Sequence, residues 1–274
     1  MIEQLSFLLW PFLGLLCIGA IHVYLGLHVV EREVIFVDLS LAQMAVLGAA
    51  MASLWGHEPG EPWTYALALA FTVVGAATFA FTRSDRARVP QEAIIGIVYA
   101  VAAAASVLIL NSAPHGAEHI RDVLVGQLLA VEAKDVARLA VLYTVIGALH
   151  AWWRKRLLLI SQDPAAARAQ GVNVRAWDFL FYVTFGITVT ASVELGGVLV
   201  VFSYLVVPSV TSMLFARHVG TRLAIGWTVA ALASALGMLA SVALAAPPGA
   251  SVVVVFGALL VLAALARPLV ARRA

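Results

Sequence analysis

Long apolar runs occupy most of this chain, and they constrain its fold more than any other feature. Nine segments approach or reach the ~20 residues that a helix needs to cross a bilayer. They fall at residues 5–29, 34–55, 63–82, 92–111, 138–153, 178–193, 197–216, 223–245 and 251–270. The fifth and sixth are short for a span, so we expect their helices to extend into the flanking polar residues. Residues 120–131 are too short and too charged to cross, and they favour an interfacial or re-entrant helix.

Composition supports the same conclusion. The chain is 63% hydrophobic and 12% charged, whereas a soluble domain carries about 45–50% apolar and about 25% charged residues. The first residues include Glu3 and no basic stretch, so no cleavable signal peptide is expected. Cys17 is the only cysteine, which excludes an intrachain disulfide and a cysteine-based metal cluster. We predict an all-α polytopic membrane protein with eight or nine transmembrane helices, forming one domain over residues 1–274.

The basic residues predict the orientation, because cytoplasmic loops are enriched in Lys and Arg. Alternate loops hold 14 of the 17 basic residues, namely Arg32, Arg83, Arg86, Arg88, Arg154, Lys155, Arg156, Arg168, Arg175, Arg217, Arg222, Arg267, Arg272 and Arg273. Nine spans then place the N-terminus outside and the C-terminus in the cytoplasm. The opposite loops hold eight acidic residues, Glu3, Glu58, Glu61, Glu118, Asp122, Glu132, Asp135 and Glu194. These acids either concentrate cations at the outer mouth or simply solvate the loops.

A polar island interrupts the apolar runs at residues 161–172. Asp163 suits an N-cap, Pro164 the first helical position, and Gly171 the left-handed residue after the last turn. These signals predict a helix of about two turns, roughly 10 Å long, on the most basic cytoplasmic loop. Its small-sided surface suits a groove on another protein, and the alternative is a well-capped connector.

Asp38 is the first of two places where chemistry is expected. An ionisable group near membrane depth usually faces a cavity or a partner. A stripe of small residues follows on the same helix face, made of Ala42, Ala45, Ala49 and Ala52. Asp38 therefore lines a pathway, or it lies in the first helical turn and complements the helix dipole.

The second place is an H-x-x-E-H sequence formed by His115, Glu118 and His119, which formally matches a zinc peptidase motif. Pro114 and Gly116 weaken a helix there, so a cation-attracting patch and a plain solvated loop are the alternatives. His22, Glu92 and Glu194 are scattered and are expected to be structural. No glycine is followed by lysine, so the chain has no P-loop for ATP, and no aromatic platform supports nucleic-acid binding.

Five stretches together resemble one family, the membrane permease subunits of ABC-type zinc, manganese and iron uptake transporters (the ABC-3 family). The stretches are DLSLAQ (38–43), EAIIGI (92–97), DVLVGQLL (122–129), DPAAARAQGV (163–172) and GGVLVVFSYLVVP (196–208). The fourth and fifth are specific in combination, and the resemblance covers most of the chain.

The resemblance implies a permease that provides the path of an ATP-driven divalent-metal importer in the bacterial inner membrane. Such subunits form homodimers, work with two cytoplasmic ATP-binding subunits, and receive metal from an extracytoplasmic binding protein. It implies no enzymatic activity in this chain and no permanent cofactor, only the transported zinc, manganese or iron. Asp38 matches the aspartate of the family's D-A-L-S-H-A stretch. The polar island matches the coupling helix that docks on the ATPase, through Asp163, Pro164, Ala166, Ala167, Arg168 and Gly171.

One position departs from the family pattern. The family histidine falls on Ala42, which has no ligand atom. Gln43 is the nearest polar side chain and shares the Asp38 face only if the helix carries a local bulge. We therefore expect a path that holds metal loosely, and the alternative is that His22 or Glu194 supplies the missing ligand. The alternative functions are a permease for metal chelates of the siderophore or cobalamin type, a secondary transporter or channel, and, remotely, a membrane zinc peptidase.

Overall fold

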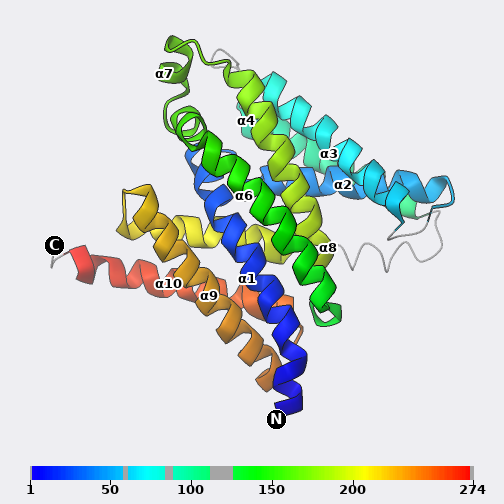
Figure 1. Ribbon diagram of the computed structural model, residues 1–274, viewed down its shortest axis with the longest axis vertical. Helices are drawn as coiled ribbons and strands as arrows, with labels where there is room; N and C mark the ends of the chain where they lie inside the picture. The colour runs from blue at the N-terminus through cyan, green and yellow to red at the C-terminus, as the bar shows by residue number, and fades with distance from the viewer. Residues whose placement is uncertain (1, 58–60, 84–88, 112–125, 272–274) are drawn as a thin grey trace. The chain divides into compact units, whose positions relative to one another are not determined.

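The computed structural model describes residues 2–57, 61–83, 89–111 and 126–271. This part of the chain is helical, without strands (Figure 1). The helices are α1 (Ile2–Glu31), α2 (Val37–Leu54), α3 (Pro62–Thr82), α4 (Gln91–Leu110), the short 3₁₀ helix η1 (Leu128–Ala130), α6 (Ala133–Gln162), α7 (Pro164–Ala169), α8 (Val174–Phe215), α9 (Val219–Leu244) and α10 (Pro248–Ala271). The predicted all-α class is confirmed.

Eight of the described helices are long and apolar enough to cross a membrane, so the chain is a multi-pass membrane protein. One of them, α8, covers two of the predicted spans. Gly197 interrupts it with φ 75° and ψ 162°, which are not helical values. A glycine adopts this backbone conformation without the steric penalty of a Cβ. The count is therefore eight if α8 is one span and nine if its two halves, before and after Gly197, are counted separately.

The two segments that looked short in the sequence do extend into polar flanks. Helix α6 begins at Ala133 and ends at Gln162, so Arg154, Lys155 and Arg156 all lie within it. Helix α8 begins at Val174. Only residues 128–130 of the predicted interfacial helix at 120–131 are helical among the described residues, and they form one 3₁₀ turn.

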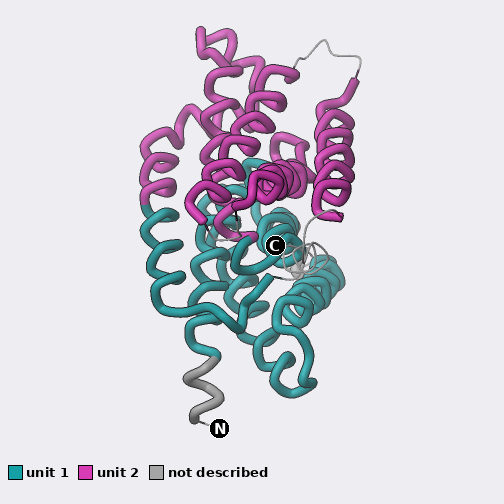
Figure 2. The backbone as a smooth tube through the Cα atoms, turned by 90° about the vertical axis from the view of Figure 1, so that its right-hand side faces the viewer, with its two compact units in different colours: residues 1–30, 125–144, 194–274 teal, residues 31–124, 145–193 magenta. Residues whose placement is uncertain are grey.

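The chain divides into two compact units (Figure 2). Unit 1 comprises residues 1–30, 125–144 and 194–274, and unit 2 comprises residues 31–124 and 145–193. Helices α6 and α8 each contribute one part to either unit. Unit 2 contains α2, α3, α4 and α7, and with them Asp38, Gln43 and Glu92.

Close helix approaches through glycine characterise unit 1. A Cβ on Gly26 of α1 would overlap the carbonyl oxygen of Leu205 in α8. Small residues allow such contacts because the backbones can then approach one another directly. Deeper in the unit, the Tyr204 hydroxyl hydrogen-bonds to Ser234 of α9, and its ring packs edge-on against Phe256 of α10.

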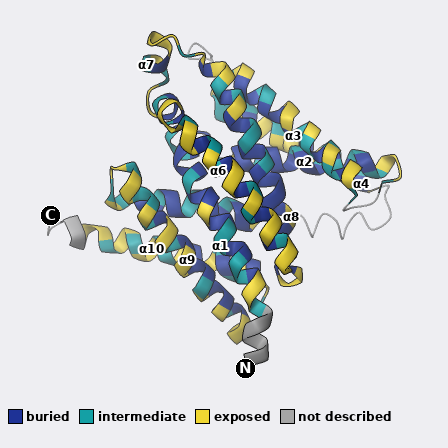
Figure 3. Cartoon of the chain, viewed as in Figure 1, coloured by how far each residue is buried: buried dark blue, intermediate teal, exposed yellow. Residues whose placement is uncertain are grey.

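In unit 2, helix α2 packs between α3 and α4. Gly48 of α2 lies so close to the backbone of Leu67 in α3 that a Cβ would overlap it. Helix α2 is mostly buried, whereas α4 and α10 are mostly exposed (Figure 3). The exposed side chains of α4 and α10 include large apolar ones, such as Leu108 and Val254. Apolar faces without protein cover suit the hydrocarbon of a bilayer.

Candidate functional site

The candidate site lies at the connection between α1 and α2. Helix α1 ends at Glu31, and residues 32–36 form a tight connection in which Glu33 has a positive φ of 56°. Helix α2 then begins at Val37, so Asp38 lies in its first turn. Asp38 is 1% exposed. The short connection therefore places the Asp38 carboxylate in a buried position directly after the turn.

The Asp38 carboxylate is buried without a hydrogen-bond partner. Neither Oδ1 nor Oδ2 has one among the described residues. The backbone N–H groups of Leu39 and Asp38, at the start of α2, approach the carboxylate as donors, but without the geometry of a full hydrogen bond. A buried charged group that lacks hydrogen bonds is costly, because folding removes its water without replacing it. The helix dipole stabilises the negative charge, but it does not supply the hydrogen bonds that the two carboxylate oxygens could accept.

A second carboxylate comes from helix α4. Glu92 lies in the first turn of α4, and its Oε1 accepts a hydrogen bond of 3.0 Å from the backbone N–H of Phe36. Its Oε2 is buried and has no hydrogen-bond partner in the described structure. Phe36 lies two residues before Asp38, so its hydrogen bond places the Glu92 carboxylate at the same end of α2 as Asp38. We call Asp38 and Glu92 the carboxylate pair.

The carboxylate pair has the chemistry of a weak cation site. Two like charges in a poorly solvated place repel one another, and a cation between them would relieve both the repulsion and the missing hydrogen bonds. Carboxylate oxygens suit hard and borderline divalent ions. No group of three or more His, Cys, Asp or Glu side chains able to hold a metal occurs among the described residues. A two-carboxylate site favours transit over tight retention.

The small-residue stripe of α2 shares the face of Asp38. Its members are buried at Ala42, Ala45 and Ala52 and half-buried at Ala49. Gln43 is also buried, at 8% exposure. Residues 37–54 form a regular α-helix without a π-bulge, so Gln43 lies about 140° around the axis from Asp38. The structure does not bring Gln43 onto the Asp38 face.

The other nominated residues do not join the pair. The His115, Glu118 and His119 cluster lies outside the described residues. His22 belongs to unit 1, is fully buried, and its Nδ1 lies 3.0 Å from the carbonyl oxygen of Ile18 one turn earlier. Glu194 is exposed, and its nearest basic partner is Arg138 at 3.9 Å. The Nε2 of His22 is buried without a hydrogen-bond partner in the described structure, and the structural roles expected for His22 and Glu194 stay predictions.

The polar island folds as the sequence predicts. Helix α7 spans Pro164–Ala169, and the Asp163 side chain caps it by accepting a hydrogen bond of 2.8 Å from the backbone N–H of Ala166. Gly171 follows with a φ of 76°, the left-handed conformation that glycine favours after a helix. These local features are confirmed.

Helix α7 has an inner and an outer face. Ala167 is fully buried and packs with Ile160 of α6 and Val174 of α8. The outer face carries Ala165, Arg168 and Ala169, all exposed. Ala166 is half-buried between the two faces. Ala167 therefore holds the loop together, while the exposed alanines leave a shallow surface with one charged side chain.

Two contacts at the candidate site were not expected from the sequence. Glu92 opens an apolar helix and looks like an ordinary first-turn acid, so its proximity to Asp38 is visible only in three dimensions. Asp178 was not singled out, although it is the one acidic residue within the apolar run of α8 before Glu194. That isolation was the available signal, since a lone acid in such a run usually has a partner.

Comparison with known proteins gives consistent results. A model of the ABC 3 transport family matches residues 4–267. The manganese transport system membrane protein MntC of Listeria monocytogenes is 23% identical over 259 residues, covering 92% of this chain and 88% of MntC. The high-affinity zinc uptake system membrane protein ZnuB of Haemophilus influenzae is 23% identical over 206 residues, covering 75% and 76%.

Among solved structures, PsaBC from Streptococcus pneumoniae in complex with Fab has a similar fold. The TM-score is 0.80 at 20% sequence identity, and the match covers 96% of this chain and 95% of that one.

Proposed function

The chain belongs to the ABC 3 transport family, and on this premise we propose that it is the path-forming permease of an ATP-driven importer of divalent metal ions, with manganese or zinc as the first substrates to test. Relatives that cover most of this chain carry the names of manganese transport and zinc uptake membrane proteins. The observation that carries the proposal is the carboxylate pair, in which Asp38 is buried and Glu92 half-buried, because both oxygens of Asp38 and Oε2 of Glu92 have no hydrogen-bond partner in the described structure.

The partners follow from what the chain lacks and from the shape of α7. The sequence has no P-loop, so a separate cytoplasmic subunit must hydrolyse ATP. The outer face of α7 is the proposed docking surface for that subunit. We further propose an extracytoplasmic binding protein that delivers the metal and a second copy of this chain that completes the path. The looser, two-carboxylate site leaves metal selection to the delivering protein.

The test is metal uptake into proteoliposomes that contain the permease with its ATPase and binding protein. Asp38→Asn keeps the side-chain shape and removes the charge, so uptake of manganese and zinc should fall about tenfold or more, a transition-state loss of ~1.4 kcal/mol. Glu92→Gln should act similarly. Combining Asp38→Asn with Glu92→Gln should reduce uptake by less than the product of the two single losses, and to about the level of either single variant. The reason is that both residues serve one site.

Asp135→Asn is the matched control, since Asp135 also lies in the first turn of a spanning helix, α6. Its uptake should stay within about twofold of the unmodified protein, because the dipole effect of one such carboxylate is only about 0.3–1 kcal/mol. Equal losses in Asp38→Asn and Asp135→Asn would assign Asp38 to helix stabilisation. Undiminished uptake in a folded Asp38→Asn protein would remove it from the path.

A further inference from the structure

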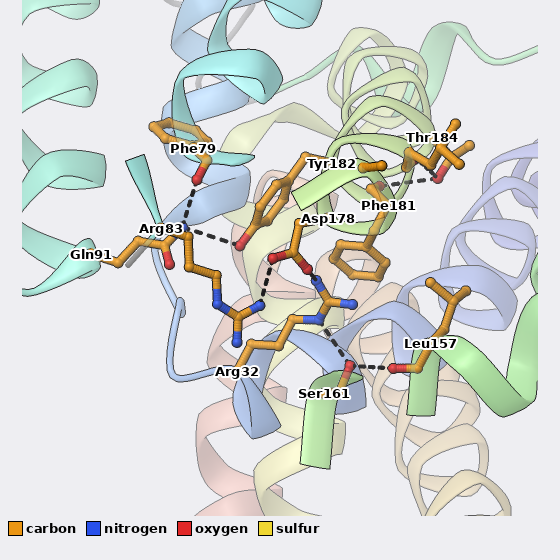
Figure 4. A network of polar contacts seen from close by, with 12 residues as sticks. Arg32, Phe79, Arg83, Gln91, Leu157, Ser161, Asp178, Phe181, Tyr182 and Thr184 are labelled. Carbon is orange, nitrogen blue, oxygen red and sulfur yellow. Dashed lines mark hydrogen bonds and ion pairs between the residues drawn. The ribbon is translucent and has the colours of Figure 1, made fainter. Parts of the chain in front are cut away.

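Arg32 occupies an unusual position immediately after α1. Its guanidinium Nη1 donates to Oδ1 of Asp178 at 2.7 Å, and its Nε donates to the Ser161 hydroxyl at 2.8 Å (Figure 4). The side chains of the ion pair are fully buried, and the guanidinium also lies over the Phe181 ring at 4.0 Å. One side chain thus contacts the end of α6 and the beginning of α8 at once.

The geometry is more specific than stability requires. A buried ion pair loses about as much free energy by desolvation as it gains by attraction, so it is weak evidence for stabilisation alone. A guanidinium, however, fixes direction, because its donors have a rigid fork geometry. Arg83, the residue that follows α3, binds the other oxygen of Asp178 at 2.8 Å, and its side chain is 14% exposed, whereas that of Arg32 is fully buried. The arrangement fixes where Arg32 lies relative to Ser161 and Asp178.

Ser161 and Asp178 flank the α7 loop on its two sides. Ser161 lies in the last turn of α6, two residues before the cap Asp163, and Asp178 lies near the start of α8. Between them, Ala167 of α7 packs against Ile160 and Val174. A force applied to α7 therefore reaches both contacts of Arg32 through packed, hydrogen-bonded structure.

Arg32 is also the first residue of the connection to the carboxylate pair. The connection ends at Phe36, whose N–H is held by Glu92, and Asp38 follows two residues later. Asp38 lies six positions after Arg32, and even a fully extended chain of that length spans only about 20 Å. The tight turn at 32–36 leaves little slack, so a displacement of Arg32 must shift the start of α2.

We propose that Arg32 is a positioning residue that links the α7 loop to the carboxylate pair. When a partner moves α7, Ser161 and Asp178 move Arg32, and the 32–36 connection changes the distance between Asp38 and Glu92. The pair then alternates between holding and releasing a divalent cation. This inference rests on the proposed function, since it assigns the carboxylate pair to the metal and the outer face of α7 to the ATPase.

The experiment measures manganese uptake and ATP hydrolysis together in proteoliposomes of the whole complex. Arg32→Lys keeps the charge but cannot make both contacts, and Asp178→Asn removes the carboxylate charge. Each should keep the ATPase bound and hydrolysing within about twofold, while manganese uptake falls about tenfold, which is ~1.4 kcal/mol of lost coupling. Ser161→Ala should raise the ATP used per manganese ion about threefold, since it removes the acceptor of the Arg32 Nε hydrogen bond, together with the bond from Ser161 to the Leu157 carbonyl oxygen within α6.

Arg83→Gln is the matched control. It removes a guanidinium from the same carboxylate but leaves Arg32 with both of its contacts, so the ATP used per manganese ion should stay within about twofold. Combining Arg32→Lys with Asp178→Asn should add little to either, because the two residues act through one contact.

The inference is overturned if uptake and hydrolysis fall in proportion in Arg32→Lys and Ser161→Ala, since that is the signature of a purely structural role. It is equally overturned if Arg83→Gln uncouples as strongly as Arg32→Lys. If Asp178→Asn does not accumulate in the membrane, the two milder variants decide. Loss of uptake in Asp38→Asn together with an unchanged ratio in the Arg32 and Ser161 variants would refute the link and leave the proposed function standing.

Discussion

Single residues in this protein show how differently two buried ionisable groups can be used. His22 and Asp38 both lie inside apolar helices and are almost completely buried. The Nδ1 of His22 lies within hydrogen-bonding distance of a carbonyl oxygen of its own helix, which suits a neutral imidazole. Asp38 has no such contact for either oxygen among the described residues. The Nε2 of His22 is also buried without a hydrogen-bond partner in the described structure. Burial with unused hydrogen-bonding capacity therefore does not identify a functional group by itself, and Asp38 is distinguished by a second carboxylate, Glu92, at the same end of α2.

The contrast leads to opposite expectations for two histidine substitutions. His22→Ala should leave manganese uptake per folded complex within about twofold, although the cavity should lower thermal stability. Ala42→His should slow manganese release and narrow the range of metals transported, because an imidazole one turn from Asp38 adds a ligand suited to borderline metals. Since Ala42 is 2% exposed, the larger side chain should also destabilise the protein by about 1–3 kcal/mol.

Uptake of manganese, zinc and iron by both variants, with a melting curve for each, tests these expectations. A large loss in His22→Ala that is not explained by the amount of folded protein, with no change in Ala42→His, would show that His22 supplies a ligand to the path.

Among the helices, α7 is the clearest case of an element that is specified locally and held in place by tertiary contacts. Its cap, proline and terminal glycine define a helix only six residues long. A helix this short is not stable alone, because nucleation is unfavourable. The burial of Ala167 between α6 and α8 supplies the missing stabilisation. The exposed alanines of the outer face are then free for a partner.

Substitutions on the outer face should abolish docking without disturbing the loop. Ala165→Arg combined with Ala169→Arg places two bulky charges on exposed positions one turn apart, and the ATPase should then fail to copurify, a loss of about tenfold or more in affinity. Ala167→Arg is unsuitable for this purpose, because it would place a charge in the core of the loop.

The matched control is His218→Arg, which adds a charge to an exposed residue in another predicted cytoplasmic loop. Copurification of the ATPase with His218→Arg and not with the double variant supports α7 as the docking helix. Retention of the ATPase by the double variant would contradict it.

At the scale of the whole molecule, the number of membrane crossings depends on how α8 is counted. A 42-residue helix that crossed once would place α9 and α10 in the opposite orientation from one that turns back at Gly197. The basic residues of the loops favour the second case, with Arg168 and Arg267 on the same cytoplasmic side. Glu194, three residues before the break, would then lie outside.

Site-directed labelling can distinguish the two topologies, because Cys17 is the only native cysteine. In a Cys17→Ala background, Arg168→Cys and Arg267→Cys should both react with an impermeant maleimide only after the cells are permeabilised. Glu194→Cys, whose native side chain is 58% exposed, should react in intact cells. Reaction of Arg168→Cys and Arg267→Cys from opposite sides would show that α8 crosses once.

The sequence by itself determined the features that depend on neighbouring residues. Apolar length predicted the spanning helices, and the capping residues predicted α7 down to its cap at Asp163 and its glycine at 171. Both signals are local, since hydrophobic burial in a bilayer and helix capping involve residues within a few positions of one another. The five matching stretches also identified the family that the comparison confirms.

Only the tertiary structure decided which distant polar residues meet. Arg32 and Asp178 are 146 positions apart and Phe36 and Glu92 are 56 apart, and no periodicity in a single sequence encodes such pairings. The broken φ/ψ at Gly197 was equally hidden, because the apolar run continues through it. The physical reason is that a polar group in an apolar helix can be satisfied by any nearby helix. Which helix is nearby depends on the packing of the whole unit, to which small residues such as Gly48 contribute by close backbone contact.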